Sequence, residues 1–321
     1  MRVLLLGGAG YIGQVAAGKL LEEGFEVHTV DSLIHGPQAQ EALFRHKGFS
    51  FDTGDLNDPE LMGSLAAGHD AVVLLAGLVG EAACDRDPRL TLASNYLSPL
   101  LLLEACLFHG KVGRFVFIST DSCYGNRPGE ILDEEAELRP ISLYAALKAR
   151  LEGEILGRAK GSNLTATVLR FATVYGLAPR TRFDLAVNIL TREATLRKVA
   201  TIYSGEQWRP LVHVSDAAGA IAMALKEPTG RVGGQILNVG SNDQNVRFDT
   251  LGRLIAELVP GSEIVTVPGA PDLRDYHVSF GKIAALGFKA KVSLRDGIRG
   301  LRDALIKGEI ADPYDPSLRN A

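Results

Sequence analysis

The chain has 321 residues, of which 46% are hydrophobic and 22% charged, and its 34 Lys and Arg against 38 Asp and Glu give a formal net charge of −4. This composition is typical of a folded globular protein and excludes a disordered or fibrous chain. The basic residues are spread without the run that is typical of a nucleic-acid-binding surface. A small phosphate-bearing ligand is compatible with this charge, because it needs only a few well-placed cations.

Three cysteines, Cys84, Cys106 and Cys123, show neither a CxxC spacing nor a nearby histidine cluster. They indicate reduced thiols, with no metal site and no disulfide framework. The run at residues 2–7 lacks the features of a signal peptide. The apolar stretch around residues 100–103 is far shorter than the roughly 20 residues that span a bilayer. We therefore expect a cytoplasmic protein without a membrane segment and without a nucleic-acid partner.

The first half of the chain alternates short aliphatic runs with helical periodicity. This pattern is typical of parallel strands joined by crossover helices. It predicts an α/β fold with a Rossmann-like, doubly wound parallel sheet. Strands are predicted at residues 3–6, 26–30, 49–51, 71–75, 114–119 and 165–170, and helices at 11–23, 59–67, 90–109 and 142–160.

From residue 171 onward the loops are longer, more polar and richer in proline, which predicts a smaller C-terminal substrate lobe. We assign residues 1–170 to an NAD-binding domain, with returns near 205–240, and residues 171–204 and 241–321 to the lobe. A helix is expected from a cap at Ser215 to Leu225, and the tail after Ala311 is expected to be extended or frayed. Other helices are expected at 183–197, 248–258 and 293–307, and strands at 200–203, 211–213 and 235–239.

A glycine-rich turn follows the first predicted strand and opens the first predicted helix. Gly7 permits the turn, Gly10 lets a pyrophosphate approach the backbone, and Gly13 lets the helix pack on the strand. Tyr11 and Ile12 begin the helix, where amide N–H groups can bind an anion. This context predicts a dinucleotide site and disfavours a purely structural turn.

Asp31 ends the second predicted strand, where a carboxylate can bond the adenosine ribose hydroxyls and repel a 2′-phosphate. This favours NAD over NADP. Ligands of doubly wound sheets bind at the carboxyl ends of the strands, so two further strand ends are expected to contact the cofactor. These are Asp55-Leu56 after the third strand and Leu75-Ala76-Gly77 at the end of the fourth.

Tyr144 and Lys148 are four residues apart near the start of a predicted helix that Ser142 caps. Residues at this spacing share one helix face about one turn apart, so the ammonium can lie near the phenol. A nearby cation lowers the pKa of a phenol and makes it a usable base. The pair therefore predicts a proton-transfer site.

These segments, together with Ser119-Thr120-Asp121-Ser122-Cys123-Tyr124-Gly125 and Leu169-Arg170-Phe171, occur in the order seen in extended short-chain dehydrogenases/reductases. Over essentially the whole chain, the sequence resembles the nucleotide-sugar epimerase/dehydratase branch of that family. The resemblance implies NAD as cofactor, contacted also by Asn95, Ser119 and Phe171, and a nucleotide sugar as substrate. Asn95 could instead be a surface or capping residue.

The same resemblance implies the catalytic roles. Tyr144 would remove a proton from a sugar hydroxyl as hydride passes to the nicotinamide, Lys148 would bond the nicotinamide ribose, and Thr120 would share the proton. Family 4,6-dehydratases commonly carry Thr-Asp-Glu where this chain has Thr120, Asp121 and Ser122, and the two acids eliminate water. Because the glutamate is missing, we expect a 4-epimerase that acts on a UDP-hexose-like substrate through a transient 4-keto sugar.

Alternatives remain open. Asp121 and Cys123 keep an unusual nucleotide-sugar dehydratase or a 3,5-type epimerase possible, because either could supply a second acid or base. A 4-ketosugar reductase also stays possible and would show net turnover of the dinucleotide. A non-catalytic dinucleotide sensor is disfavoured, because it has no need of Thr120, Tyr144 and Lys148 together.

By resemblance, Arg209 and Arg274 match arginines that bind the nucleotide diphosphate, for which two guanidinium groups are well suited. Ser122 is expected to contact the substrate. Thr173 stands where many relatives have an asparagine that touches the substrate phosphate, and Asn188 could replace that contact.

Helices 90–109 and 142–160 often pair across a dyad in relatives, so we expect a homodimer. The stripe of Leu97, Leu101 and Ala105 permits that arrangement, although the same stripe could face the sheet.

Overall fold

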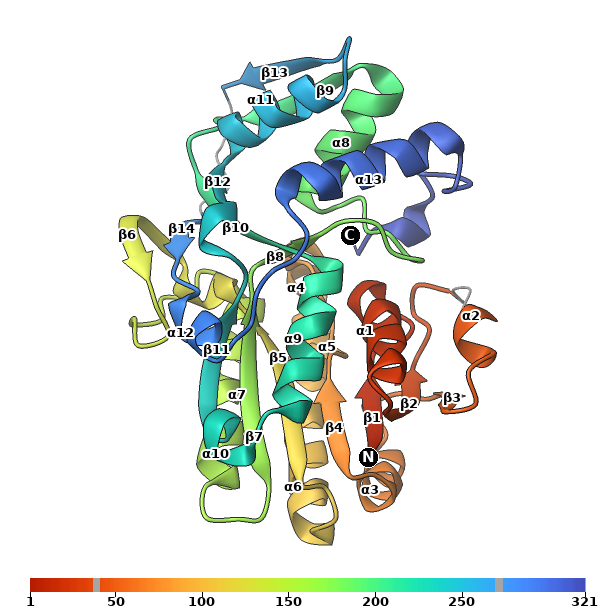
Figure 1. The fold of residues 1–321 in the computed structure, drawn as a ribbon. Helices are drawn as coiled ribbons and strands as arrows, with labels where there is room; N and C mark the ends of the chain where they lie inside the picture. The colour runs from red at the N-terminus through yellow and green to blue at the C-terminus, as the bar shows by residue number, and fades with distance from the viewer. Residues whose placement is uncertain (37–40, 269–273, 321) are drawn as a thin grey trace.

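The computed structural model describes residues 1–36, 41–268 and 274–320 (Figure 1). Its central sheet has seven parallel strands in the order β11-β7-β5-β4-β1-β2-β3. The direction of strand order reverses beside β1, which is the position where doubly wound sheets bind ligands. The predicted fold class is confirmed. The strands are β1 (Arg2–Leu6), β2 (Glu26–Asp31), β3 (Phe49–Thr53), β4 (Ala71–Leu74), β5 (Arg114–Thr120), β7 (Thr165–Phe171) and β11 (Gln235–Val239).

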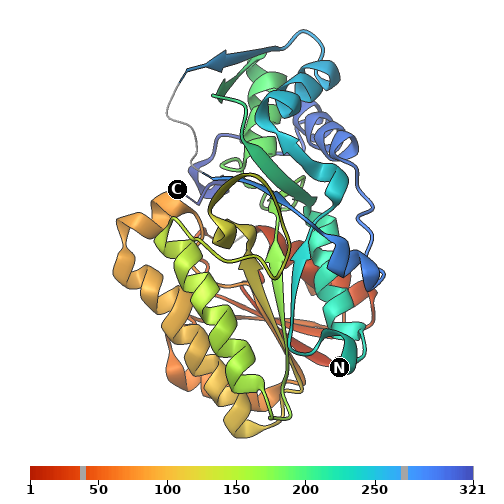
Figure 2. The same cartoon turned by 90° about the vertical axis from the view of Figure 1, so that its left-hand side faces the viewer.

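Helices cover both faces of this sheet (Figure 2). Successive side chains of a strand point to opposite faces, so β1 contributes to two cores. Val3 and Leu5 pack in the core beneath α1 (Tyr11–Glu22) and α9 (Val214–Lys226). Leu4 and Leu6 pack in the core shared by α3 (Pro59–Gly68), α6 (Ser98–His109) and α7 (Leu143–Ala159). All four side chains are fully buried, which fixes the register of β1 and the position of the turn after it.

The predicted helix at 90–109 begins two residues earlier and is divided into three parts. These are α5 (Pro88–Leu92), a π-helical turn (Ala93–Leu97) and α6. Pro99 lacks an N–H for the carbonyl of Asn95, and its ring would clash with that carbonyl in a regular helix, so the turn widens. Within the described residues, Pro88–His109 is one helical stretch of 22 residues that is long and apolar enough to span a membrane by composition. Leu102, Leu103 and Cys106 of this stretch pack in the core of the sheet.

The second half forms a lobe above the carboxyl ends of the strands (Figures 1 and 2). Its core packs Val187, Ile202 and Ile298 from three different elements together. The lobe contains β8 (Thr173–Tyr175), α8 (Ala186–Arg197), β9 (Val199–Tyr203), β10 (Trp208–His213), β12 (Asn245–Arg247), α11 (Phe248–Leu258), β13 (Glu263–Val267) and α13 (Leu294–Lys307). β8, β10 and β12 form one small sheet, and β9 pairs with β13 in another.

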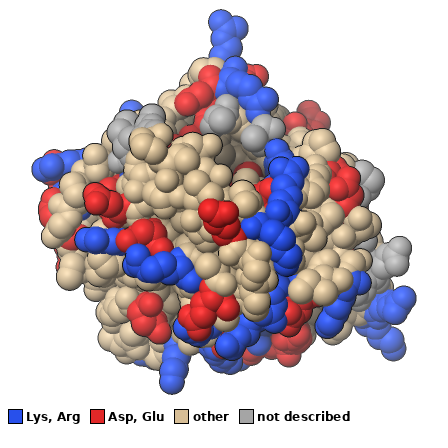
Figure 3. Space-filling model, turned by 90° about the horizontal axis from the view of Figure 1, so that it is seen from above, with Lys and Arg blue, Asp and Glu red and all other residues tan. Residues whose placement is uncertain are grey.

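Shorter elements complete the chain. They are α2 (Glu41–Phe44), α4 (Glu81–Arg86), a 3₁₀ turn (Asp121–Tyr124), β6 (Asn126–Leu132), α10 (Thr229–Val232), a 3₁₀ turn (Asn242–Gln244), β14 (Asp275–Val278), α12 (Gly281–Ala285) and a 3₁₀ turn (Pro316–Leu318). Seen from above the lobe, basic and acidic side chains lie intermingled on the surface (Figure 3).

Two local predictions are wrong. Ser215 lies inside α9, and His213 caps that helix instead, with its ring Nδ1 accepting from the Ser215 N–H at 3.3 Å. β10 therefore runs directly into α9. The tail after Ala311 is held against the lobe, because the Phe183 N–H donates to the Leu318 carbonyl at 2.8 Å. A hydrogen-bond partner far away in the sequence decides this, and the composition of the tail does not reveal it.

Candidate active site

One pocket lies at the carboxyl ends of the central strands and gathers most of the residues predicted for the site. Its wall combines the turn after β1, the ends of β2 and β4, and the start of α7. The predicted residues that line it are Gly7, Gly10, Tyr11, Ile12, Gly13, Asp31, Asp55, Leu56, Leu75, Ala76, Gly77, Ser119, Thr120, Asp121, Ser122, Tyr144, Lys148, Phe171, Thr173 and Arg274.

The glycine turn is too tightly packed for side chains. A Cβ at Gly13 would lie 2.1 Å from the Gly7 carbonyl oxygen, and one at Gly7 would lie 2.8 Å from the Ala76 nitrogen. Gly7 also has φ +86°, which favours glycine. Gly10 caps α1 without a side-chain hydrogen bond, so the first amides of the helix open onto the pocket. The glycine turn and the N-terminus of α1 therefore fit an anionic group.

Asp31 is fixed at the end of β2 by two backbone amides. Its Oδ2 accepts from the Ala9 N–H and its Oδ1 from the Leu33 N–H, both at 2.9 Å. These bonds hold the carboxylate against the glycine turn while its remaining lone pairs face the pocket. The position fits the predicted contact with ribose hydroxyls.

Tyr144 and Lys148 both line the pocket from the first turns of α7, which Ser142 caps as predicted. The Lys148 Nζ donates to the Ile118 carbonyl at 2.9 Å and lies 5.9 Å from the centroid of the Tyr144 ring. Burial lowers the pKa of Lys148 to about 8. Burial raises the pKa of Tyr144, and the nearby Cys123 and Cys84 act in the same direction. The expected lowering of the phenol's pKa is thus not present in this arrangement, because burial of the phenol raises it.

The end of β5 presents a hydroxyl and an acid to the same pocket. Thr120 Oγ1 accepts from the Ser122 N–H and donates to Ser122 Oγ, both at 3.1 Å. Asp121 is buried, and its Oδ1 accepts from the Tyr276 hydroxyl at 3.1 Å. Its Oδ2 has no hydrogen-bond partner within the described residues. Burial raises the pKa of Asp121 to about 7, although the nearby Arg209 opposes the rise.

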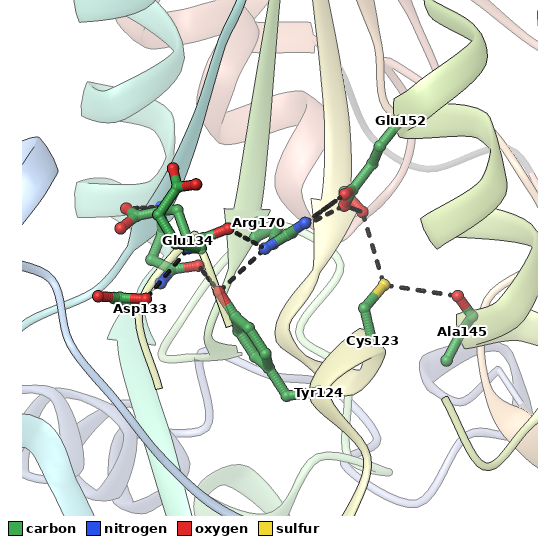
Figure 4. Close-up of polar contacts among 10 residues, drawn as sticks. Cys123, Tyr124, Asp133, Glu134, Ala145, Glu152 and Arg170 are labelled. Carbon is green, nitrogen blue, oxygen red and sulfur yellow. Dashed lines mark hydrogen bonds and ion pairs between the residues drawn. The ribbon is translucent and has the colours of Figure 1, made fainter. Parts of the chain in front are cut away.

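A buried ionic network beneath the pocket fixes α7 (Figure 4). Arg170 on β7 pairs with Glu152 on α7 at 2.7 Å, and both side chains are almost completely buried. Glu152 also accepts from Ser119 at 2.5 Å, while Arg170 donates to the Tyr124 hydroxyl at 3.0 Å. Glu152 lies one turn beyond Lys148 on the same helix face, so this network sets the height and rotation of Tyr144 and Lys148.

Cys123 packs between these groups as a small buried side chain (Figure 4). Its thiol donates to the Ala145 carbonyl at 3.4 Å, which ties the 3₁₀ turn after β5 to the start of α7. Thr120 lies at the start of the 3₁₀ turn and Tyr144 in the first turn of α7, so this bond joins the segments that carry these two predicted residues.

Three predicted residues lie outside the pocket lining. Asn95 is buried in the π-helical turn and donates to the Leu78 carbonyl at 2.9 Å, so the surface alternative is excluded. Asn188 is fully buried, accepts from the Gly176 N–H and donates to the Arg182 carbonyl, both at 2.9 Å. Arg209 is buried with its guanidinium 5.3 Å from the Tyr276 ring centroid. Asn95 and Asn188 shape the loops of the pocket, and Arg209 acts on Asp121 by its charge.

Arg274, which was predicted at the nucleotide diphosphate, lines the pocket and pairs with Glu81 at 3.4 Å, which joins the lobe to the loop after β4. The pocket also contains residues that the sequence did not point to. Arg180 and Arg182, from the loop between β8 and α8, line the opposite side together with Asn320 from the C-terminal tail. No local motif marks these residues, because the lobe brings them to the pocket from distant parts of the chain.

Comparisons with known proteins agree with this geometry. The family model for the NAD dependent epimerase/dehydratase family matches residues 3–240. A dTDP-glucose 4,6-dehydratase of Streptomyces niveus is 30% identical over 319 residues, covering 93% of this chain and 90% of that protein. The crystal structure of a Thermus thermophilus UDP-glucose 4-epimerase in complex with NAD is 32% identical with a TM-score of 0.80, covering 94% of this chain and 98% of that one. A Thermotoga maritima UDP-glucose 4-epimerase with UDP-glucose is 29% identical with a TM-score of 0.85, covering 96% and 100%.

The chain belongs to the NAD-dependent epimerase/dehydratase family. It is an NAD-dependent enzyme, and the predicted family and cofactor are confirmed. The described residues fit the cofactor: the glycine turn leaves no space for side chains, and Asp31 is held by backbone amides at the end of β2.

Proposed function

We propose that this enzyme is a nucleotide-sugar 4-epimerase that acts on a UDP-hexose-like substrate through a transient 4-keto sugar. One observation carries the proposal: Thr120, Tyr144 and Lys148 line the same pocket as the glycine turn, while Ser122 leaves Asp121 as the one carboxylate of the 3₁₀ turn on the pocket wall. Epimerisation needs one proton acceptor at the sugar hydroxyl and the return of hydride to the other face of the sugar.

The residues divide this work. NAD, which the glycine turn and Asp31 would hold, would supply the acceptor and donor of the hydride. Tyr144, in its phenolate form, takes the proton of the C4 hydroxyl, and Thr120, whose hydroxyl already donates within the pocket, shares that proton with the substrate oxygen. Lys148 is half protonated near pH 8, so it can bind a ribose hydroxyl as either donor or acceptor and adjust the charge next to Tyr144. Arg274 is placed in the pocket to bind a phosphate of the nucleotide.

A 4,6-dehydratase is the second candidate, and Asp121 is the reason to keep it. The carboxyl group is buried with one unpartnered oxygen, and its raised pKa of about 7 makes it a proton donor at neutral pH. Water elimination uses a proton donor for the leaving hydroxyl and a base for the adjacent C–H. Asp121 could serve the first step, but Ser122 supplies no carboxylate for the second.

Product analysis separates the two candidates. The purified holoenzyme is incubated with UDP-, GDP- and dTDP-hexoses, and the products are followed by NMR. Inversion at C4 without net NADH formation supports the epimerase. A 4-keto-6-deoxy product would refute it and establish the dehydratase. In a separate incubation with a nucleotide-linked 4-keto sugar and added NADH, a 4-hydroxy product formed with stoichiometric NADH consumption would establish the reductase.

We also propose a homodimer formed through α6. Leu97 in the π-helical turn before α6, and Leu101 and Phe108 on the outer side of α6, are 48%, 51% and 87% exposed, whereas Ala105 packs toward the core. An exposed apolar face on an ordered helix is typical of a protein interface. Light scattering tests this: Leu101→Glu should convert a dimer into a monomer, and an unmodified chain that is monomeric would refute it.

We further propose a cytoplasmic location, supported by three free, buried cysteines, as is usual in a reducing compartment. The division into residues 1–170 and the lobe also stays a proposal. It is supported by the separate apolar core of the lobe.

A further inference from the structure

The C-terminal strap, residues 313–320, crosses from the lobe to the mouth of the NAD pocket. Figures 1 and 2 both place the C-terminal end between the lobe and the top of the sheet domain. At its start, Arg192 on α8 donates to the Pro313 carbonyl at 2.9 Å and stacks 4.3 Å from the Tyr314 ring centroid. Leu318 then packs against the small apolar cluster that contains Phe183 and Leu301. The strap therefore has a defined path.

Arg180 holds the far end of the strap with most of its donors. This side chain is only 2% exposed. Its Nη2 donates to the Ser317 carbonyl and to Asn320 Oδ1, both at 2.8 Å, and to the Arg319 carbonyl at 3.2 Å, while Nε donates to the Ser317 carbonyl at 3.1 Å. Burying a guanidinium is costly unless its donors are satisfied. Here backbone carbonyls and one side-chain amide of the strap accept from Nε and Nη2, so the position of Arg180 and the position of the strap depend on each other.

The end of the strap lines the same pocket as the glycine turn. Asn320 lies against Gly80 in the loop after β4, where a Cβ would be 3.2 Å from the Asn320 carbonyl oxygen. Arg180 lies near enough to Asp31, at the end of β2, for their charges to interact. In the sheet, β1 lies between β4 and β2. Asn320 on the β4 side and Arg180 on the β2 side, joined by their hydrogen bond, therefore flank the turn after β1.

We propose that the C-terminal strap closes the NAD pocket over the glycine turn, and that Arg180 is the positioning residue that latches it. The bound dinucleotide is then enclosed between the helix N-terminus and the strap. Its exchange requires the strap to leave Arg180. NAD consequently stays on the enzyme between turnovers, which a reaction that returns its hydride to the substrate permits. This proposal rests on NAD binding and not on which sugar reaction follows.

The test measures retention of the cofactor. Enzyme loaded with radiolabelled NAD is mixed with excess unlabelled NAD, and bound label is followed over time by rapid gel filtration. In Arg180→Met we expect label to leave about tenfold or more faster, which is the effect of losing a few hydrogen bonds to a charged group. The control is Arg231→Met. Arg231 lies on α10, is exposed and pairs with Glu227, so its replacement should leave the rate of NAD release unchanged.

Two further measurements keep the test decisive if Arg180→Met fails to fold. Asn320→Ala removes one acceptor of the latch and should also speed NAD release, by less than Arg180→Met. In the unmodified enzyme, NAD should slow hydrogen exchange of the amides in residues 313–320. A folded Arg180→Met or Asn320→Ala enzyme that releases NAD at the unmodified rate would overturn the proposal, as would exchange in the strap that does not respond to NAD.

Discussion

Replacing Lys148 by methionine should stabilise the folded chain at pH 7 while removing a residue of the proposed active site. A lysine whose pKa falls from 10.5 to about 8 by burial costs about 3 kcal/mol of folding free energy at pH 7, at about 1.4 kcal/mol per pKa unit. Methionine has a similar length and no charge. It loses the hydrogen bond to the Ile118 carbonyl, which costs about 1 kcal/mol. The expected net gain at pH 7 is therefore about 2 kcal/mol.

The pH dependence of this gain is the sharper test. The folded pKa of Lys148 lies below the unfolded one, so the unfolded chain binds more protons between about pH 8 and 10.5. The stability of the unmodified enzyme therefore rises through that window relative to Lys148→Met, and the advantage of the variant disappears there. Urea unfolding of both proteins, free of NAD, at several pH values between 7 and 10 measures the difference.

Lys111→Met is the matched control, because Lys111 is exposed and its replacement should give no pH-dependent difference. A Lys148→Met variant whose stability relative to the unmodified enzyme is the same at pH 7 and pH 10 would show that Lys148 carries no burial cost. Lys148 would then not be half protonated near pH 8.

Three other perturbations test the site. Gly13→Ala should abolish NAD binding in calorimetry, because its Cβ would lie 2.1 Å from the Gly7 carbonyl oxygen, whereas Gly63→Ala has open space and should bind normally. Arg170→Met should lower the free energy of unfolding by about 3–5 kcal/mol, because Glu152 is left as a buried unpaired charge. Adding Glu152→Met should restore most of the lost stability. Equal losses of stability in the single and double variants would contradict this expectation. Asp121 loses its proton near pH 7. Any fall in turnover as the pH rises through 7 should therefore be absent in Asp121→Asn. An unchanged pH–rate profile would exclude Asp121 as a proton donor.

Much of the sheet domain could be predicted because its signals are local. The runs that begin at Val3 and Arg114 are buried on both faces and read as continuous apolar strands. The glycine turn and the spacing of Tyr144 and Lys148 carry their geometry in adjacent residues. For these features, one strand or one helical turn is enough context.

What the sequence did not reveal depends on contacts between distant residues. Glu152 is paired because β7 brings Arg170 against it. The strap is held because Arg180 donates hydrogen bonds to its end. The pKa of Tyr144 depends on burial, which a four-residue spacing does not specify. Arg209, which was expected at the substrate, lies outside the pocket lining, and its charge lowers the pKa of Asp121.

The central claim is that oxidation at C4 is followed by return of the same hydride to the opposite face of the sugar. UDP-glucose carrying deuterium at C4 tests this most directly, with the holoenzyme in ordinary water and NMR of the products. We predict UDP-galactose that retains the deuterium at C4 and takes up no solvent hydrogen elsewhere in the ring. A 4-keto-6-deoxy sugar, or a product with its C4 deuterium replaced by solvent hydrogen, would contradict the account.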